Sequence, residues 1–143
     1  MIIAARFPVF PTQRPGEGDD YLFMMAASVL VVDDDPAFRA LAGTVLGDAG
    51  MTLVGEADSV AAAMAAAARL EPSAVLVDVG LPDGDGFELA RQLTALPWHP
   101  CVVLTSLDGD VGTADEVRRS GARAFVPKAD LPDAPLARLL GAE

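Results

Sequence analysis

Two kinds of hydrophobic pattern alternate along the chain from residue 28 onward. Short apolar runs recur about every 25 residues, without the regular polar interruption of a half-exposed strand. They are SVLVV (28–32), MTLVG (51–55), AVLVD (74–78), CVVLT (101–105) and RAFVP (123–127). Continuous apolar runs of this length are typical of strands buried on both faces of a parallel sheet. The pattern therefore predicts five central strands.

The segments between these runs have the properties of helices. In the first, Phe38, Leu41, Ala42, Val45 and Leu46 have the spacing of one helix face. The other four predicted helices lie within 59–70, 86–96, 111–121 and 133–141. Strands that alternate with helices form a parallel sheet with right-handed crossovers and with helices on both faces. We therefore expect a single α/β domain of the doubly wound type.

Polar side chains collect where the predicted strands end. They are Asp33 and Asp34 after the first strand, Asp78 at the third, Thr105 and Ser106 at the fourth, and Lys128, the only lysine, after the fifth. The carboxyl ends of parallel strands lie at one edge of a sheet, where open α/β sheets bind their ligands. We therefore expect these side chains to form one site.

The residue types in this predicted site suit phosphoryl transfer to a carboxylate. Clustered carboxylates repel each other, and Mg²⁺, which prefers oxygen ligands, would offset that repulsion. A carboxylate can attack phosphorus once the charge of the phosphoryl group is neutralised. A lysine ammonium and a threonine hydroxyl can hold the remaining phosphoryl oxygens.

Length, composition and charge narrow the class of protein. The chain has 143 residues, of which 52% are hydrophobic, as expected for one globular domain. Its net charge of −11 argues against direct binding to nucleic acid. The apolar stretches are shorter than the ~20 residues of a membrane-spanning helix. The single cysteine, Cys101, which we interpret as a small buried residue, fits a reducing cytosol. We therefore expect a cytoplasmic protein that does not bind membranes.

Residues 1–26 differ from the rest of the chain. They contain several prolines and glycines and show no sustained period. They also lack the basic start and the long apolar core of a secretory signal. We expect a disordered extension or an upstream start, with Met24 or Met25 as the natural first residue, followed by one domain over 27–143.

Four motifs resemble those of the receiver domains of two-component response regulators, close in pattern to single-domain chemotaxis-type receivers. VVDDDPAFR is similar to the acidic-pair segment of that family, and LVDVGLPDGDG to its phosphoacceptor strand and following loop. LTS and FVPK are similar to its hydroxyl and lysine segments. The order and spacing of all four match between about Ser28 and Leu140. The resemblance implies a flavodoxin-like fold with strand order 2-1-3-4-5 and the site at the switch point of strand order.

The resemblance also implies a role for each residue of the acidic site. Asp78 would accept the phosphoryl group and contribute to the binding of Mg²⁺. Asp34 would bind Mg²⁺ directly, and Asp33 would act largely through water. The backbone carbonyl of Gly80 would be a further ligand.

A conformational switch is implied by the same resemblance. Thr105 would turn its hydroxyl toward the phosphoryl group, and Lys128 would pair with that group. Phe125 stands at the position of an aromatic residue that swings inward when Thr105 moves, although its context is also that of a core residue. The region that changes shape would comprise the fourth helix, the fifth strand and the fifth helix.

The implied partners belong to a two-component signalling system. A histidine kinase or a histidine phosphotransfer protein would donate the phosphoryl group. A downstream protein, or an output domain outside this sequence, would respond to the change. The formation of a homodimer on phosphorylation is a further alternative. The chain would catalyse only its own phosphorylation and dephosphorylation.

Two alternative functions stay open from the sequence. A haloacid-dehalogenase-like phosphatase would use Asp33 as its nucleophile, because Asp33-x-Asp35 after an apolar strand resembles the opening motif of those enzymes. The chain is short for that class, however, and it lacks a second acidic cluster after the lysine. A receiver-like module could instead bind partners without phosphorylation, although the complete acidic set argues against it.

One position departs from the usual residue of the family, and two others bear on the lifetime of the phosphoryl group. Ala129 follows Lys128, where the family usually has a proline and a cis peptide bond, so the geometry of this bond is open. Gly80 and Leu107 lie two residues beyond Asp78 and Thr105, and neither side chain can orient an attacking water. We therefore expect a phosphoryl group on Asp78 to hydrolyse slowly.

Other polar residues have structural interpretations. Asp35 is expected to cap the first helix, with Pro36 at its first position, and Asp85 to cap the third. The sequence DGDG at 83–86 resembles part of a calcium loop but lacks the remaining ligands, so we interpret it as a turn. His99 lies in a loop and is not interpreted as a phosphodonor.

Overall fold

The computed structural model describes residues 27–108 and 113–141. The strands are β1 (Ser28–Val32), β2 (Thr52–Ala57), β3 (Ala74–Asp78), β4 (Gly80–Leu81), β5 (Gly84–Asp85), β6 (Cys101–Ser106) and β7 (Ala124–Pro127). The helices are α1 (Pro36–Asp48), α2 (Val60–Leu70), α3 (Gly86–Thr94), α4 (Ala114–Ser120) and α5 (Leu136–Leu139), and a 3₁₀ helix (Lys128–Asp133) precedes α5. The expected N-terminal extension, 1–26, lies outside the described residues.

Five of the strands form one parallel sheet in the order β2-β1-β3-β6-β7. These are the five strands predicted from the apolar runs, and their order is the one that the resemblance implied. The chain moves outward from β1 to one edge, returns to β3, and then continues to the other edge. The order therefore reverses between β1 and β3, which is where such sheets bind ligands.

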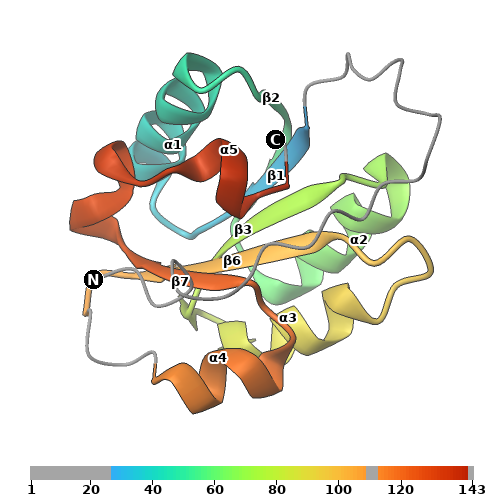
Figure 1. Ribbon diagram of the computed structural model, residues 1–143. Coiled ribbons are helices and arrows are strands. Elements are labelled where there is room, and N and C mark those ends of the chain that lie inside the picture. The colour runs from blue at the N-terminus through green and yellow to red at the C-terminus, as the bar shows by residue number, and fades with distance from the viewer. Residues whose placement is uncertain (1–26, 109–112, 142–143) are drawn as a thin grey trace, which may run out of the picture.

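Helices cover both faces of the sheet (Figure 1). Helices α1 and α5 pack on one face, and α2, α3 and α4 pack on the other. Val29 and Val31 of β1 belong to the first core cluster, while Leu30 and Val32 belong to the second. Both sides of each central strand are therefore buried, which explains the continuous apolar runs.

Helix α1 begins and packs largely as its sequence predicts. Asp35 caps it by accepting a hydrogen bond from the backbone N–H of Ala37 at 3.0 Å. Phe38 and Leu46 are buried, but Leu41 is 45% exposed. At about 100° per residue, Leu41 lies at the border of the apolar face.

The sequence pattern did not reveal three short elements, and it indicated a longer final helix than the structure has. It did not predict the short antiparallel hairpin β4–β5 or the 3₁₀ helix that starts at Lys128. The helix predicted over 133–141 is confined to Leu136–Leu139. Pro135 precedes that helix, and prolines disfavour a helical conformation in the residue before them.

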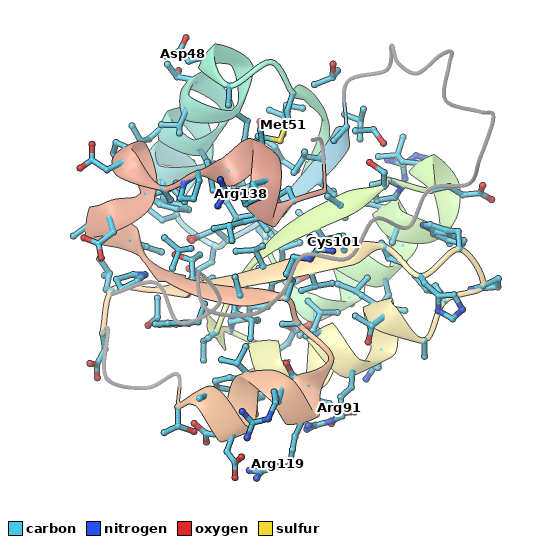
Figure 2. The ribbon with its side chains drawn as sticks, viewed as in Figure 1. Asp48, Met51, Arg91, Cys101, Arg119 and Arg138 are labelled. Carbon is cyan, nitrogen blue, oxygen red and sulfur yellow. The ribbon has the colours of Figure 1, made fainter. Side chains whose placement is uncertain are left out.

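The outer sides of the helices carry charged residues. Arg91 and Arg119 lie on the exposed sides of α3 and α4 (Figure 2). Within the described ranges, none of the helices has the length and apolar character needed to cross a membrane.

Candidate functional site

Three carboxylates meet at the carboxyl ends of β1 and β3. One oxygen each of Asp33, Asp34 and Asp78 lie within 4.8 Å of one another. Asp33 and Asp78 are buried, whereas Asp34 is exposed. The two strands pair directly, with Val32 beside Val77, so the residues that follow them reach the same edge. The fold therefore brings the predicted acidic residues together.

Lys128 lies against this acidic cluster. Its Nζ is 2.7 Å from Asp33 Oδ2 and 3.7 Å from Asp78 Oδ2. The approach to Asp33 lacks the angles of a good hydrogen bond, but at this distance the two charges still form an ion pair. The described residues contain no cis peptide bond, so the Lys128–Ala129 bond is trans.

Thr105 is the penultimate residue of β6 and lies beside the acidic cluster. It pairs in register with Asp78 of β3 and is fully buried. Its Oγ1 is enclosed and has no hydrogen-bond partner among the described residues. A buried hydroxyl without a partner is costly, which makes it a good candidate to bind a ligand that completes the site.

Charge and burial act together on Asp78. Burial raises the pKa of its carboxyl above the ordinary value, and the neighbouring Asp33 carboxylate raises that pKa further. Lys128 and a hydrogen bond from the Gly80 N–H oppose this increase. A cation bound between Asp33, Asp34 and Asp78 would favour the ionised form of Asp78 in the same way as Lys128.

The loop after β3 runs close to the Asp78 carboxylate. The Gly80 N–H donates to Asp78 Oδ1 at 3.3 Å. The loop then folds into the β4–β5 hairpin and enters α3, which Asp85 caps through the Phe87 N–H at 2.8 Å. The predicted cap of the third helix is thus confirmed, and the Gly80 backbone lies beside the acidic cluster.

Comparison with known proteins identifies the family of the chain. Residues 29–138 match the response regulator receiver domain. The chain belongs to this family. The match includes all of the candidate site residues from Asp33 to Lys128, so the resemblance seen in the four motifs is confirmed.

Curated relatives of this receiver domain are longer than the chain. It is 40% identical over 112 residues to the DNA-binding transcriptional activator DevR/DosR of Mycobacterium tuberculosis, covering 77% of this chain and 51% of the relative. It is 35% identical over 109 residues to protein-glutamate methylesterase/protein-glutamine glutaminase 3 of Hahella chejuensis, covering 75% of this chain and 31% of the relative. The chain thus spans about half or less of these relatives.

A solved structure agrees with the fold. The signal receiver domain of the putative response regulator NarL from Mycobacterium tuberculosis has a TM-score of 0.68 and 28% sequence identity. The alignment covers 82% of this chain and 92% of that one. The flavodoxin-like fold class predicted from the sequence is therefore confirmed.

Two further residues of the receiver domain contact the site and were not found from the sequence. The Phe38 ring lies under the Lys128 ammonium, with Nζ 4.3 Å from the ring centroid. Arg39 donates from Nη1 to the Asp33 carbonyl at 2.7 Å and pairs through Nε with Glu56 at 2.7 Å. Their adjacent positions on α1 gave only a helix pattern, because contacts with distant strands are not visible in a local period.

Phe125 and Leu107 differ sharply in exposure. Phe125 is 1% exposed and packs in the core on the side of α2, α3 and α4. This burial agrees with its interpretation as a core residue, and its role in switching stays a prediction. Leu107, which follows β6, is 86% exposed and has no polar group to offer to a ligand.

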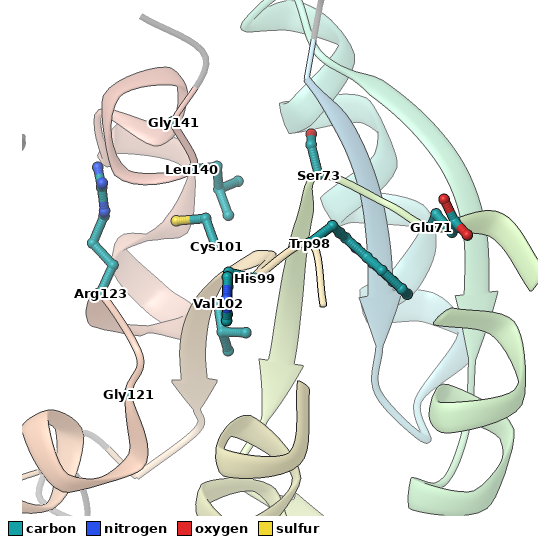
Figure 3. A pocket seen from close by; sticks show the side chains of 10 residues that line it. All are labelled: Glu71, Ser73, Trp98, His99, Cys101, Val102, Gly121, Arg123, Leu140 and Gly141. Atoms are coloured by element: carbon teal, nitrogen blue, oxygen red, sulfur yellow. The ribbon is translucent and has the colours of Figure 1, made fainter. Parts of the chain in front are cut away.

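A cavity of about 730 Å³ lies at the opposite end of the sheet (Figure 3). Its walls include Trp98 and Cys101 near the start of β6, Arg123 before β7 and Leu140 after α5. None of the candidate site residues lines it. The cavity is therefore separate from the acidic site.

Proposed function

We propose that this receiver domain is a phosphorylation-activated switch in which Asp78 accepts the phosphoryl group. The observation that carries the proposal is the position of Asp78, which lies among two further carboxylates, the Lys128 ammonium and the unpartnered hydroxyl of Thr105. Each group has a separate part in phosphoryl transfer: nucleophile, cation ligand or stabiliser of phosphoryl oxygens.

In the proposed reaction, a carboxylate oxygen of Asp78 attacks the phosphorus of a phosphohistidine on a histidine kinase or a phosphotransfer protein. The new O–P bond forms as the P–N bond breaks, and the donor imidazole nitrogen keeps the electron pair and takes up a proton from water. Lys128 Nζ, 3.7 Å from Asp78 Oδ2, stabilises negative charge on the transferred group. Burial of Asp78 limits access of bulk water to the new bond.

The acidic cluster fits a Mg²⁺ ion. Asp33, Asp34 and Asp78 would hold it together with the Gly80 carbonyl, because hard cations prefer such oxygen ligands. Bound Mg²⁺ would offset the mutual repulsion of the carboxylates and part of the phosphoryl charge. The ion pair between Asp33 and Lys128 supports a water-mediated role for Asp33, while the exposed Asp34 is suited to direct contact.

Switching would follow from the added charge. A phosphoryl group adds nearly two negative charges and new acceptor oxygens at pH 7. The Thr105 hydroxyl would turn to donate to one of these oxygens, and Phe125, on the neighbouring strand, would repack with it. The region around α4, β7 and α5 would then present a changed surface.

The response would be read by another protein or by a separate domain. The two curated relatives described above carry the names of a DNA-binding activator and of a methylesterase, and each is longer than the part that aligns. The net charge of −11 favours a protein partner over nucleic acid for this chain. We propose no enzymatic activity beyond phosphorylation and dephosphorylation of Asp78.

The phosphatase alternative receives no support from the acidic pair on which it relied. Asp35 uses its carboxylate to cap α1, and Asp33 is paired with Lys128.

The switch and the phosphatase alternative name different nucleophiles, Asp78 and Asp33, so one experiment separates them. The protein is incubated with Mg²⁺ and acetyl phosphate, and its intact mass is measured. We expect the wild type to gain one phosphoryl group, and only when Mg²⁺ is present. Asp33→Asn should gain the same group more slowly. A wild type that gains no phosphoryl group would reject the proposal.

The phosphorylated protein is expected to lose its phosphoryl group slowly. Gly80 has no side chain, and the exposed Leu107 carries no group that could orient an attacking water. The decay of the phosphorylated mass after removal of acetyl phosphate measures this lifetime. A lifetime of only a few seconds without a phosphatase would contradict the expectation.

A further inference from the structure

The loop between β3 and α3 is tied to the start of α2 by Asp83, a residue that the proposed reaction does not use. Asp83 lies at the turn of the β4–β5 hairpin. Its Oδ1 accepts a hydrogen bond from the Val60 N–H at 2.7 Å, and its Oδ2 accepts one from the Ala61 N–H at 3.1 Å. Both carboxylate oxygens are therefore bound to the backbone of another element.

These two bonds complete the N-terminus of α2. The first N–H groups of a helix have no acceptor within the helix. Ser59 accepts a bond from the Ala62 N–H at 3.1 Å, and Asp83 provides acceptors for Val60 and Ala61. The same bonds lower the pKa of Asp83 below its ordinary value, so its carboxylate is ionised at neutral pH.

The loop contacts the phosphoacceptor on its other side. The Gly80 N–H donates to Asp78 Oδ1 at 3.3 Å, and the Gly86 N–H donates to the Val79 carbonyl at 2.8 Å. A Cβ atom on Gly86 would collide with the Asp78 carbonyl, so the backbone at Gly86 is packed directly against the end of β3. The loop is thus held between β3 on one side and α2 on the other.

We infer that Asp83 is a positioning residue, which clamps this loop to α2 and thereby fixes the Gly80 peptide beside Asp78. The inference rests on the proposed function, in which Gly80 and Asp78 are ligands of Mg²⁺. Without the clamp, the loop keeps its contacts with β3 but loses its two hydrogen bonds to the start of α2. The binding of Mg²⁺ then has to order the Gly80 peptide, which lowers the affinity, although Asp83 touches neither the metal nor the phosphoryl group.

The test compares Asp83→Ala and Asp83→Asn with the wild type and with Asp58→Asn. Asp58 is an exposed carboxylate just before α2, so its substitution removes the same charge from the same helix end and leaves the clamp intact. The dissociation constant of Mg²⁺ is measured by calorimetry, and amide hydrogen exchange of Gly80 is followed without Mg²⁺. We expect Asp83→Ala to weaken Mg²⁺ binding about tenfold, the lower end for residues that orient metal ligands. Exchange at Gly80 should become faster.

The Asp83→Asn variant serves to distinguish loss of the clamp from a general loss of folding. Its amide oxygen keeps one of the two hydrogen bonds, so we expect a smaller loss of Mg²⁺ affinity, and Asp58→Asn should bind Mg²⁺ as the wild type does. An unchanged Mg²⁺ affinity in Asp83→Ala, or an equal loss in Asp58→Asn, would overturn the inference while the wild type still binds Mg²⁺ and is phosphorylated. A wild type that binds no Mg²⁺ would overturn the proposed function as well.

Discussion

Replacing Asp78 by asparagine is expected to abolish phosphorylation by acetyl phosphate. The amide cannot act as the carboxylate nucleophile, while its shape and its place between Lys128 and the Gly80 N–H are retained. Intact mass after incubation with Mg²⁺ should show no added phosphoryl group, whereas Asp58→Asn should be modified as the wild type is. Phosphorylation that persists in Asp78→Asn would show that another residue is the nucleophile.

The same substitution should stabilise the protein at pH 7 in the absence of Mg²⁺. Burial and the Asp33 carboxylate raise the pKa of Asp78, so the folded state binds its proton more tightly than the unfolded state. Stability is therefore lost as the pH rises from the unfolded pKa through the folded one, and the ionised Asp78 is a cost at pH 7. Asparagine removes that cost, with an expected gain of about 1 kcal/mol in the free energy of unfolding.

Chemical denaturation at several pH values in EDTA checks this gain. The difference between Asp78→Asn and the wild type should shrink at acid pH, as the Asp78 carboxyl becomes protonated in both the folded and the unfolded wild type. Mg²⁺ should stabilise the wild type more than the variant, because the variant has lost one anionic ligand. A variant that is less stable than the wild type at pH 7 without Mg²⁺ would contradict the assigned effect of burial.

Replacing Lys128 by methionine should destabilise the protein and slow its phosphorylation. Methionine keeps an apolar stem over the Phe38 ring but leaves Asp33, whose side chain is 0% exposed, without its cation. Breaking a buried ion pair from one side commonly costs about 3 kcal/mol. The loss of a charged group near the transferring phosphoryl group should also reduce the rate with acetyl phosphate by about 100-fold.

A double-mutant cycle separates the ion pair from packing. Adding Asp33→Asn to Lys128→Met removes the unpaired charge, so the double variant should recover a large part of the lost free energy of unfolding. Lys128→Arg, which keeps the positive charge, serves as the control. Equal stability of Lys128→Met and the wild type at low Mg²⁺ would show that the 2.7 Å ion pair contributes nothing to folding.

The sequence predicted the fold well because its signals are local. The runs at 28–32, 74–78 and 101–105 are continuous and apolar, and only strands buried on both faces require such a pattern. The caps Asp35 and Asp85 were also predictable, since each bonds to an N–H two residues later. The N-terminal extension stays a prediction, because 1–26 lies outside the described residues.

The site was predicted as a set of residues rather than as a set of contacts. Parallel strands bring their carboxyl ends to one edge, so Asp33, Asp78, Thr105 and Lys128 could be assigned to that edge from their positions at the strand ends. The sequence could not say which carboxylate pairs with Lys128. That preference for Asp33 depends on the path of the 3₁₀ helix, which carries no periodic signal in a short segment with Pro132.

The chain by itself thus determined which segments form the central sheet, which side of the first helix is largely buried and which residue types meet at the edge of the sheet. Only the tertiary structure decided that Phe38 lies under Lys128 and that Asp83 holds the start of α2. Periodicity and capping act over a few neighbouring residues and can be read along the chain. Contacts such as these join side chains that lie far apart in sequence, and their geometry is set by how the helices and loops pack on the completed sheet.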